Sequence, residues 1–235
     1  MDHRLRFRLP RLAVLCGALL LAGCAASPYE DRFEHINRPI RSFNDGLDRV
    51  VTRPLAQGYV AIAPEIVRDG ISNFFVNLRY PLVPVNQLLQ GKPGLAASDT
   101  GRFLVNSTLG VAGIFDPATG MGLPRHQEDF GQTFGVWGFP MGDYIVLPLW
   151  GGVTTRELIG NVFGAYMYAP TYLNAAGHRA AVVGLDLVNV RSQLLGSEDL
   201  ITGDRYIFLR DSWLQRREFL TNDGRIEDPF LDDDF

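Results

Sequence analysis

The spacing of apolar residues predicts a chain built mostly of short, interrupted helices. Apolar residues recur at intervals of three and four from Phe33 to Leu47, which places them on one face of a helix. Pro39 lies inside this pattern and has no backbone N–H to donate, so we expect a kink or a restart there. A second apolar stripe follows Pro64, a residue suited to the first turn of a helix, and runs to about Arg79.

Similar spacing predicts further helices along the rest of the chain. A short helical turn is expected within 86–93 and longer helices over 96–109, 178–195 and 206–219. Thr154 or Thr155 is a suitable N-cap for another helix that continues to about Tyr166. These elements indicate a mainly α fold.

Two glycine-rich stretches interrupt the helical pattern. Residues 110–124 combine four glycines with several apolar residues and predict a loop or hairpin, folded over the core or turned towards a partner or a membrane. Residues 129–151 carry five glycines among aromatic residues. Within them Tyr144–Leu147 resembles a buried strand, although Pro148 argues against a central position in a sheet.

The N-terminus has the pattern of a secretory signal. Four arginines precede an apolar run from Leu12 to Leu21, and small residues lead to Gly23 and Cys24. The run is about 10 residues long, whereas a spanning helix needs about 20, so we expect the segment to be cleaved.

The cysteine makes this signal distinctive, because Leu-Ala-Gly-Cys resembles the bacterial lipobox. The resemblance implies cleavage after Gly23 and attachment of diacylglycerol and an N-acyl chain to Cys24. Two or more chains anchor a protein stably. Ala25 and Ala26 stand where lipoproteins retained at the inner membrane usually carry Asp, which favours the periplasmic face of the outer membrane. The alternative is an ordinary signal peptide that carries a cysteine by chance.

Composition excludes several classes of protein. Without the four arginines and Asp2 of the signal, the chain keeps 18 basic and 25 acidic residues, a net charge of −7 that argues against nucleic acid binding. Cys16 leaves with the signal, so no thiol remains for a disulfide or a thiolate metal site. We expect a signal peptide at 1–23, a lipidated tether at 24–34, one helical domain at 35–222 and an acidic tail at 223–235.

Motifs spread over nearly the whole mature chain resemble the MlaA/VacJ family of outer-membrane lipoproteins. The strongest block runs from Asp129-Phe130-Gly131 to Gly151 and includes Leu147-Pro148. The other matching positions are Asn37-Arg38, Phe43-Asn44, Arg53-Pro54, Ser72-Asn73-Phe74, Asn77-Leu78, Pro81, Asn86, Leu89-Gln90-Gly91, Arg102-Phe103, Asn106, Leu109-Gly110, Gly113, Asp116, Arg156 and Gly160. Ile36 and Glu157 depart from the usual pattern.

The resemblance implies a single domain made of a ring of short, broken amphipathic helices, lying in one leaflet around an amphipathic channel. Such proteins remove phospholipids misplaced in the outer leaflet and pass them to a soluble periplasmic carrier. They associate with trimeric porins, use no cofactor beyond the acyl chains, bind no nucleic acid and catalyse no covalent chemistry.

A channel for a lipid headgroup needs a polar lining, because unpaired charge in hydrocarbon is costly. The candidates are polar residues set beside aromatic ones, although each one alone also suits a helix cap or a buried hydrogen bond. They are Asn37, Arg38, Asn44, Asn77, Asn86, Arg102 and Asn106. The 110–124 loop falls where the family has a hairpin thought to gate the channel, which makes Gly110, Gly113, Phe115, Asp116, Gly120 and Gly122 candidate gating residues.

Two alternative functions are an enzyme and a structural lipoprotein. The sequence does not support an enzyme such as an envelope hydrolase, because the common serine and zinc hydrolase motifs are absent. His126 beside Glu128 and Asp129 suggests one corner of a metal site, but a solvated polar turn explains it more simply, and we expect no metal. The second alternative is a structural lipoprotein that binds porins or cell wall without moving lipid.

Overall fold

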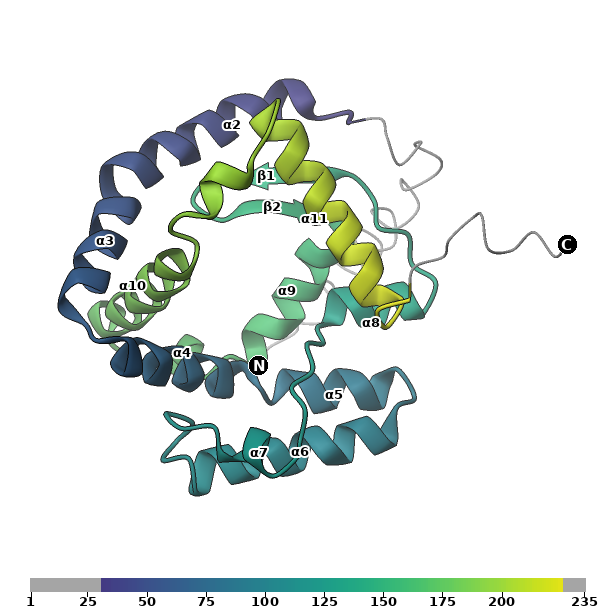
Figure 1. The fold of residues 1–235 in the computed structure, drawn as a ribbon. Coiled ribbons are helices and arrows are strands. Elements are labelled where there is room, and N and C mark those ends of the chain that lie inside the picture. The colour runs from purple at the N-terminus through teal and green to yellow at the C-terminus, as the bar shows by residue number, and fades with distance from the viewer. Residues whose placement is uncertain (1–30, 226–235) are drawn as a thin grey trace, which may run out of the picture.

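A computed structural model describes residues 31–225, and these form one mainly helical domain, as predicted. In Figure 1 the helices trace a ring, with a helical hairpin projecting from its lower edge. The predicted cleavage and lipidation sites at Gly23 and Cys24 lie outside the described residues, as does most of the tail at 223–235. The domain boundaries stay predictions. Among the described helices, none is long and apolar enough to cross a membrane.

The upper and left edges of the ring are one nearly continuous helical segment. Helix α2 (Glu34–Leu47) passes into a π-helical turn, η1 (Asp48–Thr52), and then into α3 (Arg53–Ile62). The restart expected at Pro39 does not occur, because α2 continues through that residue. The change in hydrogen-bond pattern comes later, at η1, and such π segments often mark bends in long helices.

The lower edge of the ring and the projecting hairpin follow. Helix α4 (Glu65–Arg79) has Pro64 as its N-cap and ends before Pro81, close to the predicted bounds. Helices α5 (Leu82–Leu89) and α6 (Pro93–Thr108) pack together as an antiparallel pair outside the ring. The short helix α7 (Pro117–Gly120) lies against α6 within the predicted 110–124 loop.

The right side of the ring contains an element that the sequence pattern did not indicate. Residues of the second glycine-rich stretch form helix α8 (Phe130–Val136), which packs on α9 and α11. The predicted strand is β1 (Tyr144–Leu147), which pairs antiparallel with β2 (Gly151–Thr154). In this two-stranded hairpin both strands are edges, so Pro148 is tolerated directly after β1.

Three longer helices complete the chain, close to the predicted positions. They are α9 (Thr155–Met167), α10 (Ala176–Gln193) and α11 (Arg205–Thr221), with short 3-10 turns η2 (Ala169–Tyr172) and η3 (Ser197–Leu200) between them. Thr154 caps α9 in a capping box with Glu157. A small core of Tyr144, Val146 and Tyr206 lies where β1 meets α2 and α11.

Candidate functional site

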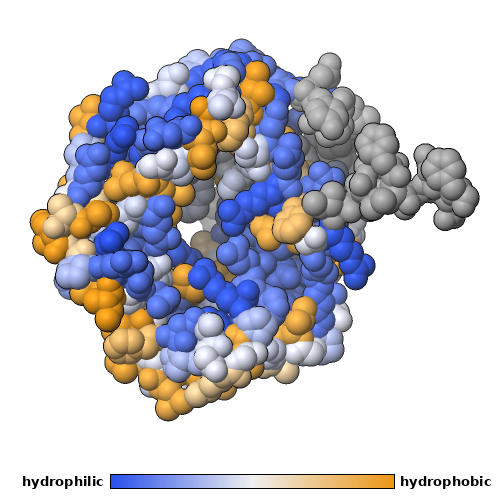
Figure 2. Space-filling view, in the orientation of Figure 1, coloured by the Kyte–Doolittle hydropathy of each residue, from blue (hydrophilic) through white to orange (hydrophobic). Residues whose placement is uncertain are grey.

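The distribution of polar and apolar side chains is inverted relative to an ordinary soluble domain. Among residues 31–225, ten apolar and fifteen polar or charged residues are buried. Many large apolar side chains are exposed instead, including Ile62 at 85 % and Ile66 at 74 %, at the corner between α3 and α4. In Figure 2 hydrophilic residues surround a central hollow, while hydrophobic residues gather on the left and lower rim. An exposed apolar surface of this extent marks a membrane or partner contact.

Asn37 joins three parts of the ring. Its side-chain amide donates to the Tyr144 carbonyl at 2.9 Å and to the Tyr206 hydroxyl at 3.1 Å, and its oxygen accepts from the Val146 N–H at 2.8 Å. The residue has no exposed surface, so these bonds replace all of its contacts with water. Asn37 therefore ties α2 to β1 and α11.

Two further lining candidates of α2 also make contacts between elements. Asn44 donates to the Leu147 carbonyl and accepts from the Leu149 N–H, both at 2.9 Å, and so holds the turn of the β-hairpin. Arg38 pairs with Glu34 at 2.6 Å and with Asp204 at 2.8 Å, and remains partly exposed.

The C-terminal helix is joined to α8 and α9 by a partly buried cluster of charges. Arg217 of α11 donates to both oxygens of Asp129, at 2.7 and 2.8 Å, and also pairs with Glu157. Trp213 donates to Glu157 at 3.2 Å. Although burial favours the protonated form of Asp129, the hydrogen bonds and charge of Arg217 outweigh it and lower the pKa of that carboxyl group. Arg217 and Trp213 thus connect the last helix to the middle of the chain.

A second polar cluster joins the projecting hairpin to the 110–124 loop. Arg102 of α6 pairs with Asp116, and Asn106 donates to the same carboxylate at 3.0 Å. The Ala118 N–H donates to Asn106 at 3.1 Å. Burial opposes ionisation of Asp116, but hydrogen bonds from Thr119 and Asn106 and the charge of Arg102 lower its pKa. The ion pair and hydrogen bond of Asp116 therefore hold the loop against α6.

The glycines of this loop permit close approach between segments. A Cβ atom at Gly113, whose φ is +88°, would lie 2.2 Å from the Cβ of Asn77 on α4. A Cβ atom at Gly110 would lie 2.4 Å from the backbone oxygens of Asn106 and Phe115. Gly120 and Gly122 have open space at the corresponding point, and Phe115 is 57 % exposed. The gating role of the loop stays a prediction.

The remaining lining candidates occupy the interior of the hairpin and its base. Asn86 is fully buried, donates to Leu82 at 2.8 Å and accepts from Thr133 of α8 at 2.7 Å. Asn77 donates to Ser107 at 2.9 Å. The structure thus gathers Asn77, Arg102 and Asn106 at one place and keeps Asn37, Arg38, Asn44 and Asn86 apart from them. Each makes hydrogen bonds within the protein, and a role in lining a lipid path stays a prediction.

The three side chains of the possible metal corner, His126, Glu128 and Asp129, contact different partners. His126 lies 2.8 Å from the buried Asp99, Glu128 accepts from Gln90 at 2.8 Å, and Asp129 pairs with Arg217. No group of three potential metal ligands occurs among residues 31–225.

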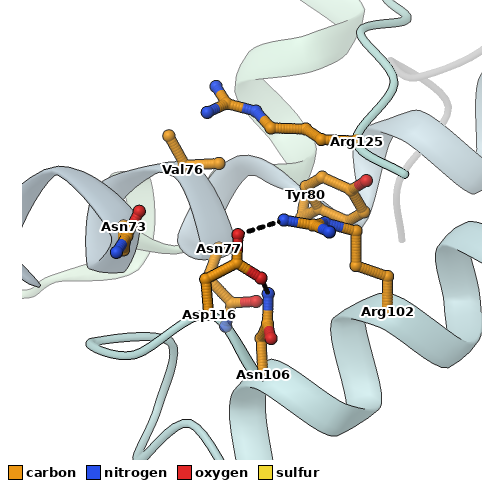
Figure 3. A pocket seen from close by; sticks show the side chains of 8 residues that line it. All are labelled: Asn73, Val76, Asn77, Tyr80, Arg102, Asn106, Asp116 and Arg125. Carbon is orange, nitrogen blue, oxygen red and sulfur yellow. Dashed lines mark hydrogen bonds and ion pairs between the residues drawn. The ribbon is translucent and has the colours of Figure 1, made fainter. Parts of the chain in front are cut away.

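A small pocket opens beside the Arg102 cluster, between α4 and the segment that leads from α7 to α8 (Figure 3). Asn73, Val76 and Asn77 of α4 line it, together with Tyr80 directly after that helix. The other lining residues are Arg102, Asn106, Asp116 and Arg125. No sequence pattern indicates Arg125, because an arginine in a polar, proline-containing stretch carries no signal of its own.

Comparisons with known proteins agree on one family. The model of the family described as MlaA lipoprotein matches residues 29–220. The intermembrane phospholipid transport system lipoproteins MlaA of Escherichia coli (strain K12) and Shigella flexneri are each 34 % identical over 238 residues, covering 95 % of this chain and 92 % of theirs. The MlaA lipoprotein of Haemophilus influenzae is 34 % identical over 229 residues, covering 92 % and 91 %.

A solved structure has the same fold. A chain from work described as "Structural basis for maintenance of bacterial outer membrane lipid asymmetry" superposes with a TM-score of 0.74 at 33 % identity, covering 82 % of this chain and 100 % of that one. The resemblance inferred from the sequence motifs is confirmed, and the chain belongs to the MlaA lipoprotein family.

Proposed function

We propose that this protein removes phospholipids misplaced in the outer leaflet of the outer membrane and passes them to a soluble periplasmic carrier. The observation that supports the proposal most directly is the inverted distribution of side chains in the ring. Apolar side chains are exposed on its rim, and hydrophilic residues surround its hollow (Figure 2). The relatives that span nearly the whole chain are described as phospholipid transport lipoproteins.

The ring suits both halves of a phospholipid. A charged headgroup moved through hydrocarbon loses its hydration at a large cost, which a polar path reduces. The exposed apolar side chains of α3 and α4 suit contact with acyl chains, because burying apolar surface contributes about 25 cal/mol per Å². No covalent bond changes in such a transfer, so we assign no catalytic residue.

In this proposal the mature protein is held by acyl chains on Cys24 at the periplasmic face of the outer membrane. A trimeric porin would position the ring in the bilayer, and the carrier would receive the lipid.

The first test is the phospholipid content of the outer leaflet in cells that lack the protein. We expect phospholipid to accumulate there, wild-type protein to remove it, and Cys24→Ala protein that still folds to fail. An outer leaflet unaltered by deletion, in a strain with no second removal pathway, would contradict transport.

A structural lipoprotein that binds porins or cell wall without moving lipid is the alternative. The two functions differ in whether purified protein carries phospholipid and delivers it to the carrier. Protein that binds a porin but neither retains nor transfers phospholipid would favour the structural function.

A further inference from the structure

Two arginines, Arg102 and Arg125, line the pocket at α4, and a third, Arg79, is close enough for its charge to act on Arg125. Arg79 and Arg102 are matched by carboxylates. Arg79 donates to both oxygens of Asp186 on α10, at 2.5 and 3.2 Å. Arg102 pairs with Asp116. Among residues 31–225, no hydrogen-bond or ion-pair partner is found for Arg125, which leaves one positive charge at the pocket unmatched.

The orientation of Arg125 sets it apart from the charge cluster below it. In Figure 3 its side chain extends across Tyr80 towards Val76, with the guanidinium turned away from Arg102 and Asp116. Arg102 and Asn106 come from α6, on the other side of α4 in this view. The segment from α7 to α8, which carries Arg125, leads from the projecting hairpin to the ring in Figure 1.

The surroundings of Arg125 suit an anion joined to an apolar group. Asn73 lines the same pocket, and its only recorded bond within the described part of the chain is a long one of 3.4 Å from its amide nitrogen to the Ile114 carbonyl. Val76 adds an apolar surface beside these polar groups. Although Arg125 keeps an exposed surface, desolvation by its surroundings and the like charge of Arg102 lower its pKa, and the opposing effects of Tyr80 and Asp116 do not cancel this shift.

We propose that Arg125, with Asn73 beside it, binds the phosphate of a phospholipid headgroup as the lipid passes α4. This inference rests on the proposed function and specifies the chemistry of one step in it. A guanidinium presents paired N–H donors that match two phosphate oxygens, and charge-assisted bonds of this kind are about twice as strong as neutral ones. Val76 would contact the glycerol carbons next to the phosphate.

The test is a binding titration with full-length acylated protein in a neutral detergent. The probes are dihexanoyl phosphatidylglycerol, dihexanoylglycerol, which lacks the phosphate, and inorganic phosphate. We expect Arg125→Gln to bind the phospholipid about tenfold more weakly and dihexanoylglycerol as the wild type does. Arg125→Lys, which keeps the charge but not the paired donors, should fall between the two.

Arg49→Gln is the matched control, because Arg49 is an exposed arginine of η1 that also lacks a recorded ion pair among the described residues. It should bind the phospholipid as the wild type does, and all three variants should unfold at the wild-type temperature. An equal loss in Arg49→Gln would assign the effect to overall charge and overturn the proposal.

The remaining outcomes separate the possible failures. Competition by inorganic phosphate at the same concentration as the lipid would assign the site to free phosphate and overturn the headgroup assignment. Wild-type binding with an unaffected Arg125→Gln variant would overturn the subsite alone. A wild-type protein that binds no phospholipid would overturn the proposed function together with the subsite.

Discussion

Arg217 near the end of α11 donates hydrogen bonds to both carboxylate oxygens of Asp129, at 2.7 and 2.8 Å, and Asp129 is the N-cap of α8. The same guanidinium pairs with Glu157 in the first turn of α9. One side chain therefore joins three elements that are separated by up to 88 residues along the chain. Such a contact closes the right side of the ring in Figure 1.

Arg217→Met should destabilise the fold strongly. The side chains of Arg217 and Glu157 are only 8 % and 5 % exposed, so the substitution leaves the Glu157 carboxylate buried without its cation. Breaking a buried pair in this way costs about 3–5 kcal/mol. Denaturant unfolding in detergent measures the change, and Arg216→Met, at the exposed neighbouring position, should have little effect. Equal stability of the two variants would show that the cluster does not hold the ring closed.

Asp129 should make the stability of the fold sensitive to acid. Since the pKa of Asp129 is lower in the folded protein than in the unfolded chain, its contribution is fully present above the unfolded pKa, about 3.9. It is lost as the pH falls through the lower, folded pKa. The carboxylate is 39 % exposed, and solvent screening keeps this contribution modest.

The measurement is the free energy of unfolding between pH 7 and pH 3. Asp129→Asn should be less stable than wild type at pH 7, and its stability should decline less as the pH falls. Asp69→Asn, at an exposed position of α4, serves as the control and should follow the wild-type curve. A wild-type slope in Asp129→Asn would contradict the assignment.

The sequence predicted most helices but not which way their faces point. The stripe from Phe33 to Leu47 does form one helix, yet Ile36 and Phe43 are 47 % and 58 % exposed while Asn37 is buried. In α11 the buried residues are Tyr206 and Arg217, so a charged side chain is buried together with an aromatic one. Periodicity identifies a helix from the contrast between its faces, and that contrast is the same whether the apolar face meets a core or a membrane.

Helix α8 and the position of Arg125 beside the predicted residues Arg102 and Asn106 were missed for a different reason. Glycine usually disfavours a helix, but Gly131 and Gly160 are placed where α8 meets α9. A Cβ atom at Gly160 would lie 2.5 Å from the backbone nitrogen of Gly131. Contacts between residues far apart in the chain decide such positions, and a pattern read along a single sequence does not contain them.

Gly113→Ala should disturb the 110–124 loop more than Gly122→Ala. Both glycines have positive φ angles, +88° and +79°, so alanine costs about 1–2 kcal/mol at either position. Only at Gly113 does the added Cβ atom meet another segment, 2.2 Å from the Cβ of Asn77, so the loop must also move away from α4. We expect a lower unfolding temperature and greater accumulation of outer-leaflet phospholipid for Gly113→Ala. Indistinguishable variants would mean that this contact does not set the loop position.

Asn37→Ala should weaken the joint between α2 and β1. The substitution leaves the Tyr144 carbonyl and the Val146 N–H without their buried partner, at a cost of about 1–3 kcal/mol. Asn174→Ala removes an exposed asparagine and should leave stability within about 0.5 kcal/mol of wild type. Denaturant unfolding of both variants tests this, and a small effect at Asn37 would show that water replaces the lost amide.

The apolar corner between α3 and α4 should contribute to membrane binding but little to the stability of the fold. Ile62 and Ile66 are 85 % and 74 % exposed, so replacing both with Asn removes little packing and should alter stability by no more than about 0.5 kcal/mol per site. If this corner lies in the leaflet, as the proposed function requires, the same change removes about 1.5–3 kcal/mol of transfer free energy per fully inserted side chain. Protein carrying Cys24→Ala should then bind phospholipid vesicles at least about tenfold more weakly when it also carries the two asparagines.

The matched control is the pair Ile62→Val and Ile66→Val, which keeps the surface apolar and should retain binding. Equal vesicle binding by the Asn and Val pairs would place this corner outside the membrane and direct attention to other exposed apolar positions on the rim.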